Sequence, residues 1–492
     1  MKALTLTGLV VGLVLTSGLD AQERIDTATN ARIREEGLQR SQAIEIFNYL
    51  TTTIGPRLTA SPAYKRSVDW TESRLRGWGL ENVHAEPFEF GRGWELTGLT
   101  LEMTAPRYMP LIGYPRGWSP ATNGRITGSP ILIGGKSAEE LRAYAGKIEG
   151  AIVMTQPMRT AFIRADRPAA SGDFRNPQPS LTPEQQAAQR AAAQEVTALL
   201  QRERPALVLE TSGGEHGTVF VLGMQRRDAP DTLPTVVLAA EHYNEIARLI
   251  QAGLPVTLSM QVSARFQDTD RNAYNVIAEL KGSDPTIGDE VVMVGAHLDS
   301  WHTATGATDN ADGVTVAMEA IRILKAIGAR PRRTIRVALW GGEEQGLLGS
   351  RDYVQRHLTG EANRAAFDKF SVYFNLDNGF VPIYGFYLQG NQAMQPIMRD
   401  WLAPFADLGA TVTTLTNIGS TDHLSFHNAG LPGFQAVHDY SGYDTRTHHT
   451  NMDTAERLDV NQLKQASVVM ASVLYHAAMR DAEIPRPQPV PR

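Results

Sequence analysis

From Asn275 onward, short apolar runs alternate with segments in which apolar residues recur at helical spacing. Helical spacing over about 314–327, 347–357, 394–405 and 460–479 follows the runs VVMVGAH (291–297), TIRVALWGG (334–342), SVYFNLDN (371–378) and PGFQAVH (432–438). A helix of this length between two strands carries the chain back so that the strands lie parallel. The alternation therefore predicts an α/β fold in which a mixed, mostly parallel sheet lies between helices.

The middle of the chain has a different texture. Between Gly124 and about Phe266, short apolar runs such as PILIGG and AIVMTQ are separated by glycines, and strand-like sequence returns over 234–266. Such runs with tight turns are typical of a small sheet. Thr182, Pro183 and Gln185 have the sequence of a helix N-terminus with a capping box, so a helix is expected from there to about Arg202.

These changes of sequence pattern divide the chain into domains. With 492 residues it is longer than a chain that folds around a single hydrophobic core. We expect a larger domain in two parts, 22–123 and 267–482, around a smaller β-rich inserted domain at 124–266. The first part contains an amphipathic segment at 64–78, whose apolar face needs the later sheet to cover it. The proline-rich residues 483–492 are expected to form a disordered tail.

The first residues have the pattern of a secretory signal peptide. Lys2 precedes an apolar stretch from Ala3 to about Leu19, and the small residue Ala21 follows. An uncleaved membrane anchor is the alternative, but the run is shorter than the roughly 20 apolar residues that span a bilayer. We expect a signal peptide at 1–21, an exported protein that is periplasmic or secreted, and no membrane association after cleavage.

Composition excludes several classes of function. With 42% hydrophobic and 20% charged residues and a net charge of −6, the chain is typical of a globular protein and has no basic excess for binding nucleic acid. Because cysteine is absent, disulfides, thiolate metal ligands and a cysteine nucleophile are excluded. No G-x-S-x-G motif of a serine hydrolase occurs, and GGEEQGLLG lacks the Gly-Lys-Ser/Thr element of a phosphate loop.

Carboxylates and histidines gather where the predicted strands end. His297 and Asp299 follow the first strand, Glu343 and Glu344 the second and Asp377 the third, whereas Asp309 and His449 lie in loops. In an open α/β sheet the carboxyl ends of the strands form the edge at which ligands bind. Carboxylates crowded at one edge repel each other unless a cation neutralises them. The pattern therefore predicts a metal site.

Imidazole together with carboxylate suits zinc, and sites with two metals commonly share a bridging carboxylate. We therefore expect two Zn²⁺ ions per chain. One would be held by His297, Asp309 and Asp377, and the other by Asp309, Glu344 and His449. Glu343 would act as general base, and Asp299 would accept the ring N–H of His297 and orient it.

Each of these residues alone has an ordinary structural interpretation. His-x-Asp occurs by chance, adjacent glutamates are usually solvated, Asp377 could cap a turn and His449 could be packed. Their joint occurrence at successive strand ends favours the metal site. For the neighbouring histidines, taken singly, we expect packing or supporting roles: His302, His423, His427, His438 and His448.

Four motifs carry a resemblance to a known family. The stretches GAHLDSWHTATGATDNADGV, WGGEEQGLLGS, FNLDN and HHTNMDT together resemble the M28 family of di-zinc exopeptidases, and HLDSW and the doubled histidine point to its carboxypeptidase Q branch. The segment IGPRLTASP and a middle part similar to a protease-associated (PA) domain extend the resemblance over nearly all of the mature chain. It implies a zinc-exopeptidase fold with an inserted PA-like domain, and the ligand, base and orienting roles given above.

One position departs from the family. Many aminopeptidases of the family have a tyrosine immediately before the last histidine ligand, where it helps stabilise the oxyanion, and this chain has His448. His448 is the first candidate for an oxyanion or substrate contact, and His423 is the second. The substitution leaves open whether the free amine or the free carboxylate of a substrate is recognised.

Together these observations predict an exported zinc-dependent exopeptidase that hydrolyses dipeptides or short peptides. An aminopeptidase acting on longer peptides is the first alternative, because it shares all of the chemistry. A non-catalytic binding protein on the same fold is an alternative from another class, although no ligand position is lost here. The helix expected at 182–202 is a candidate for a lid or a homodimer contact.

Overall fold

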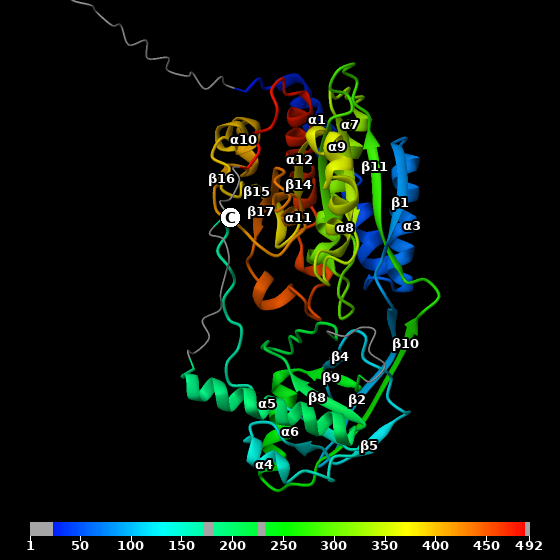
Figure 1. Cartoon of the computed structure of the whole chain (residues 1–492), viewed down its shortest axis with the longest axis vertical. Coiled ribbons are helices and arrows are strands. Elements are labelled where there is room, and N and C mark those ends of the chain that lie inside the picture. Colours follow the sequence, from blue (N-terminus) through cyan, green and yellow to red (C-terminus); the bar gives the residue numbers. More distant parts are fainter. Residues whose placement is uncertain (1–22, 171–180, 225–231, 488–492) are drawn as a thin grey trace, which may run out of the picture.

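The computed structural model describes residues 23–170, 181–224 and 232–487 and shows a larger and a smaller domain (Figure 1). The signal peptide expected at 1–21 lies outside the described residues. Among the described helices, none is long and apolar enough to cross a bilayer.

In the part of the chain that the structure describes, the larger domain is built on a mixed sheet of eight strands. The order is β1 (Glu81–Glu89), β11 (Asn272–Leu280), β13 (Thr334–Trp340), β12 (Val291–His297), β14 (Phe370–Asn375), β17 (Gly433–Asp439), β15 (Phe380–Tyr387) and β16 (Val412–Thr414). The central strands β13, β12, β14 and β17 are parallel neighbours, and the pairs β1–β11, β11–β13 and β15–β17 are antiparallel. The expected α/β class is confirmed.

Helices cover both faces of this sheet because side chains of alternating residues point to opposite sides. In β12, Val292 and Val294 join the main core, whereas Val291 and Met293 join a second core on the other face. The main core is covered by α1 (Thr27–Gln39), α2 (Ala43–Asn48), η1 (Tyr49–Ile54), α3 (Pro62–Gly77), α7 (Asp312–Ala326), α10 (Met394–Leu402) and α12 (Gln462–Met479). The second is covered by α8 (Leu348–His357), α9 (Arg364–Lys369) and α11 (His423–His427).

The smaller domain combines two further sheets around a core of its own. Met103, Leu258 and Met260 of one sheet pack with Val236 and Leu238 of the other. The first sheet has the order β3 (Met109–Pro110), β2 (Gly93–Ala105), β10 (Thr257–Gln267) and β5 (Ile126–Gly128), and the second has β4 (Gly113–Pro115), β9 (Thr235–Leu238), β8 (Leu207–Thr211), β7 (Ile152–Met154) and β6 (Ile131–Leu132). Its helices are α4 (Ala138–Arg142), α5 (Pro183–Glu203) and α6 (Ala240–Gln251).

The expected boundary of the smaller domain at Gly124 is wrong. Strand β2 pairs with β10 along its whole length, from Gly93 opposite Gln267 to Ala105 opposite Thr257, so 93–123 belongs to the smaller domain. The strand-like texture expected over 234–266 is also interrupted, because α6 lies between β9 and β10. The first difference arises from pairing between segments far apart in the chain.

Helix α5 begins where the sequence predicted. The Thr182 hydroxyl accepts from the Gln185 backbone N–H, and the Gln185 side chain returns a contact to the Thr182 N–H, which completes the capping box. The helix is mostly exposed, and Leu199 is its one fully buried residue within the described chain. It packs on α4 in the smaller domain.

The tail expected to be disordered at 483–492 is ordered over 483–487. Ile484 is buried in the main core, and the Arg486 guanidinium donates to the backbone carbonyls of Phe367, Asp368 and Phe370. The apolar Ile484 ahead of the prolines was the signal for this packing. Residues 488–492 lie outside the described residues.

A buried ion cluster joins the first helix to the main core. Arg322 of α7 donates to Glu319 at 2.7 Å and to Glu36 of α1 at 2.8 Å, and all three side chains are nearly inaccessible to solvent. Ser41 and the Gln42 backbone N–H also donate to Glu319. Each charge is therefore paired and hydrogen-bonded, which is the condition for keeping it inside a protein.

The substitution Arg322→Met is expected to leave the buried Glu319 carboxylate without a cation and Glu36 with Arg40 as its remaining partner, and to lower the free energy of unfolding by about 3–5 kcal/mol. Urea unfolding followed by circular dichroism measures this loss. The matched control is Arg364→Met, because the Arg364–Asp368 pair lies at the exposed surface and should contribute little. Equal effects of the two substitutions would contradict the assigned importance of the buried cluster.

Candidate metal centre

Three neighbouring parallel strands bring the predicted residues to one edge of the sheet. In β12 and β13, His297 lies opposite Trp340, and β14 pairs beside them with Asn375 opposite Gly295. Glu343, Glu344 and Asp377 follow within a few residues of these strand ends. The parallel register therefore produces the grouping that the sequence predicted.

Asp309 lies between two imidazoles. Its Oδ1 is 3.2 Å from His297 Nε2, and its Oδ2 is 3.4 Å from His449 Nε2. One carboxylate therefore presents a different oxygen to each histidine. This is the arrangement expected of a residue that bridges two cations.

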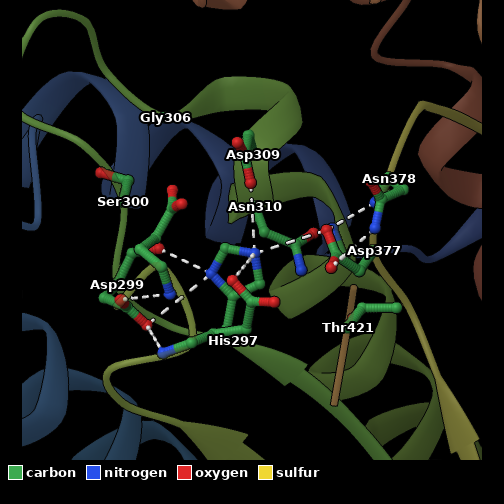
Figure 2. Close-up of polar contacts among 12 residues, drawn as sticks. His297, Asp299, Ser300, Gly306, Asp309, Asn310, Asp377, Asn378 and Thr421 are labelled. Atoms are coloured by element: carbon green, nitrogen blue, oxygen red, sulfur yellow. Dashed lines mark hydrogen bonds and ion pairs between the residues drawn. The ribbon is translucent and has the colours of Figure 1, made fainter. Parts of the chain in front are cut away.

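Each histidine has a further carboxylate partner. His297 Nε2 lies 3.4 Å from Asp377 Oδ1, and His449 Nε2 lies 2.9 Å from Glu344 Oε2. His297, Asp309 and Asp377 thus have ligand atoms within 4.8 Å of one another, as the first expected group requires. Around the second histidine, the donors within this distance of one another are Asp309, His448 and His449, and Glu344 contacts His449. Figure 2 shows His297 facing Asp309 and Asp377.

The orienting contact of Asp299 differs from the expected one. The His297 Nδ1–H donates to the backbone carbonyl of Asp299 at 3.0 Å, whereas the nearer carboxylate oxygen is 3.7 Å away (Figure 2). The carboxylate accepts instead from the Glu343 and Glu344 backbone N–H groups and from the Thr59 hydroxyl. Asp299 thus fixes the His297 ring through its carbonyl and the Glu343–Glu344 turn through its carboxylate.

The crowding shifts the acidity of the cluster. Burial and the neighbouring Asp309 carboxylate raise the pKa of Glu344 to about 7. Burial alone would lower the pKa of His449, but Glu344 and Asp309 outweigh it and raise this pKa to about 9. Burial also raises the pKa of Glu343 well above its usual range. Negative charge is thus concentrated where little solvent can screen it.

The donor atoms of the cluster fit a pair of divalent cations. His297 Nε2, Asp309 Oδ2 and Glu344 Oε1 are buried and have no hydrogen-bond partner among the described residues. Because His297 carries its proton on Nδ1, its Nε2 lone pair faces Asp309 and Asp377. Unpartnered buried polar atoms are costly, and imidazole nitrogen with carboxylate oxygen is a donor set for zinc.

Two supporting residues were missed in the sequence analysis. Arg57 is fully buried and donates to the backbone carbonyls of Leu298, Thr305 and Gly306, so it ties down both ends of the loop that follows His297. The Asp453 carboxylate accepts from the Thr308 hydroxyl and backbone N–H and from the Asp309 backbone N–H, which fixes the backbone of Asp309. Both occur in quoted motifs, IGPRLTASP and HHTNMDT, but only the fold shows their partners.

The smaller domain holds the loop that carries His449. His449 has φ of 61°, an unusual conformation for this residue, and its carbonyl accepts from the Val221 backbone N–H of the smaller domain.

A second connection between the domains is formed by residues 164–170, which we call the strap and which reach from the smaller domain to the larger one (Figure 1). In the strap, Asp166 accepts from the Gly442 and Thr445 backbone N–H groups.

A cavity of about 670 Å³ opens over the cluster. Among the described residues it is lined by Arg167, Asp309, Glu343, Glu344, Gly346, Leu347, Arg351, Asp377, Asn378, Gly419, Ser420, Leu424, Tyr443, His448 and His449. His448 therefore lies where substrate contact was expected, stacked on Tyr443. His423 does not line the cavity: it is fully buried, with Nε2 at 3.1 Å from the Ile418 carbonyl. Helix α5 contributes no described lining residue, and the strap contributes Arg167.

Comparisons with known proteins agree with this geometry. The sequence model of peptidase family M28 matches residues 275–474, which include every residue of the two metal groups. Carboxypeptidase Q of Mus musculus is 28% identical over 454 residues, covering 92% of this chain and 88% of the mouse protein, and human carboxypeptidase Q is 28% identical over 453 residues with the same coverage.

Solved structures share the fold. A peptidase M28 precursor from Shewanella amazonensis is 24% identical, with a TM-score of 0.70 over 94% of this chain and 98% of that one. A zinc aminopeptidase from Bacillus subtilis is 21% identical, with a TM-score of 0.59 over 89% of this chain and 95% of that one. The chain thus carries an M28 peptidase domain over residues 275–474 and is similar to carboxypeptidase Q over most of its length.

Proposed function

We propose that this chain is a di-zinc exopeptidase that hydrolyses dipeptides or short peptides. The observation that carries the proposal is Asp309, whose two oxygens face His297 and His449 on opposite sides. The names of the relatives, carboxypeptidase Q and a zinc aminopeptidase, support the choice of metal and of exopeptidase activity.

The residues proposed to hold the ions are His297, Asp309 and Asp377 for one and Asp309, Glu344 and His449 for the other. When bound, zinc would supply a water of lowered pKa and polarise the carbonyl of the peptide bond. The protein keeps the donors in place beforehand, because Asp299 and Asp453 orient His297 and Asp309 through the contacts described above. Such preorganisation avoids reorganising charged side chains during the reaction.

Glu343 is the proposed general base. Its Oε2 lies 4.0 Å from His297 Nε2, at the wall of the cavity, and no metal group requires it. Burial raises its pKa, so the carboxylate gains a driving force to take a proton. We propose that it accepts the proton of the attacking water and passes it to the nitrogen of the leaving amine.

The walls of the cavity favour short substrates. The strap contributes Arg167 to the lining of the cavity, and the loop held by Val221 contributes His448 and His449. His448 faces the same space and is the proposed donor to the oxyanion, in place of the tyrosine found in many aminopeptidases of the family. An aminopeptidase acting on longer peptides would need this side of the cavity to be open.

We also propose that the protein is exported, on the strength of the signal-like residues 1–21. We also propose a homodimer contact through α5, whose surface is mostly exposed. A binding protein without catalysis is disfavoured because both metal groups keep all of their donors within hydrogen-bonding or ion-pair distance.

The variant Glu343→Gln is expected to keep its fold and both metals while kcat falls on the order of 10²- to 10⁴-fold, the usual contribution of a positioned acid–base group. Steady-state hydrolysis of dipeptides and metal analysis of the same sample give the two readings. Activity close to that of the wild type would remove Glu343 from the role of general base.

The variant Asp309→Ala is expected to lose both ions together, because the bridging carboxylate serves both groups. Zinc content after dialysis, measured by mass spectrometry, should fall from about two per chain to near zero. Asp377→Ala is the matched control, because it belongs to one group and should spare the other ion. Retention of one zinc in Asp309→Ala would contradict the bridging role, and no zinc in the wild type after reconstitution would end the enzymatic proposal.

A further inference from the structure

The charges in the cavity are unequal once the metal groups are set aside. Among the described lining residues, the carboxylates are Asp309, Glu343, Glu344 and Asp377, and each of them already serves as a proposed ligand or as the base. No lining carboxylate of the described chain is left to pair with the ammonium group of a substrate. Two guanidinium groups, of Arg167 and Arg351, line the same cavity.

Arg167 is already satisfied by the protein. Its guanidinium forms a two-pronged pair with Asp444, with Nη2 at 2.6 Å from Oδ1, and it lies 5.0 Å from the ring centroid of Tyr440. Both members of the pair are largely buried. Arg167 therefore fixes the strap to the loop before His448 and brings no uncompensated charge to the cavity.

Arg351 differs in this respect. It lies in the first turn of α8, directly after the Glu343–Glu344 turn, and within the described chain its guanidinium takes part in no hydrogen bond or ion pair. The contrast is clear on the same helix: Arg356 is paired with Asp352 and, at 3.3 Å, with Glu86, and donates to the Pro87 carbonyl. Arg351 is the cation of the cavity that has no protein partner among the described residues.

We propose that Arg351 binds the free α-carboxylate of the C-terminal residue of the substrate. The planar guanidinium matches a carboxylate with two parallel hydrogen bonds, which gives orientation as well as attraction. A carboxylate held in the same cavity as the metal groups restricts cleavage to the last peptide bond. The proposal rests on the proposed exopeptidase function and adds which end of the substrate is recognised.

The test uses the zinc-loaded full-length protein and three substrates: alanyl-leucine, its C-terminal amide and its N-acetyl derivative. The wild type should cleave the free and N-acetylated acids with a KM on the order of 10- to 100-fold below that of the amide, the value of a hydrogen-bonded ion pair to a ligand. In Arg351→Met, KM for the acids should rise to that of the amide while kcat changes little. Arg351→Lys should restore part of the preference.

Arg356→Met is the matched control, because it removes the same charge from the same helix at a side chain that points to other partners. It should leave the preference for the free acid unchanged. Binding is read without turnover by calorimetry of alanyl-leucine and its amide with the zinc-loaded Glu343→Gln variant, with and without Arg351→Met. There the second substitution should abolish the difference in Kd between the two compounds.

Several results would overturn the proposal. A wild type that cleaves the amide as well as the free acid, or that needs a free amine instead, assigns recognition to another group. An Arg351→Met variant that keeps the preference excludes Arg351 itself. A zinc-loaded wild type that cleaves none of the three compounds, nor longer peptides, would instead contradict the exopeptidase function, so the two failures are distinguishable.

Discussion

The larger domain depends on keeping several carboxylates in one poorly solvated place. Asp299, Asp309, Glu343, Asp377, Asp422 and Asp453 are all buried at or behind the same sheet edge. Like charges at this separation destabilise a fold unless cations compensate them. Within the described chain, the compensating groups are His297, His449 and the buried guanidinium of Arg57, and two divalent ions would complete the balance.

The same requirement explains why the loops around the cluster are so firmly held. Arg57 spans the loop between Leu298 and Gly306, and Asp453 fixes the Thr308–Asp309 backbone from the opposite side. The smaller domain adds the His302 Nε2 contact to the Pro115 carbonyl at 2.8 Å and the Val221 contact to His449. The proposed ligands, which come from distant segments, therefore keep fixed distances without support from one continuous helix or strand.

The parts of the fold and site that could be predicted from sequence are those encoded locally. The strands before His297 and Asp377 were recognisable from their apolar runs, and parallel pairing places their ends together, so the donor set followed. The capping box of α5 was likewise a local signal. These features depend on residues close in sequence, for which spacing and side-chain chemistry are sufficient.

What could not be predicted depends on pairing over long separations. The domain boundary at Gly93 follows from the match of β2 with β10, and the role of Arg57 follows from carbonyls more than two hundred residues away. Asp299 was assigned the right neighbour but the wrong atom, since a sequence does not show whether a backbone or a side-chain oxygen turns toward His297. His423 lies near the site in sequence but is packed beside Gln389.

The connection between the domains has a consequence for how the chain folds. Strand β1 is followed closely by β2, and β10 is followed closely by β11, so the two pairs of strands form a nearly continuous antiparallel ribbon (Figure 1). Its register continues from Glu89 opposite Asn272 to Gly93 opposite Gln267. Between these positions the Phe90 backbone N–H donates to the Arg271 carbonyl. Bringing β1 and β11 together closes the long segment of chain that lies between them, and closing such a segment costs conformational entropy. Once the smaller domain has formed, β2–β10 pairing has already met that cost. The edge strand β1 is then already close to β11 and in register with it. The inserted domain therefore aligns the two halves of the larger domain.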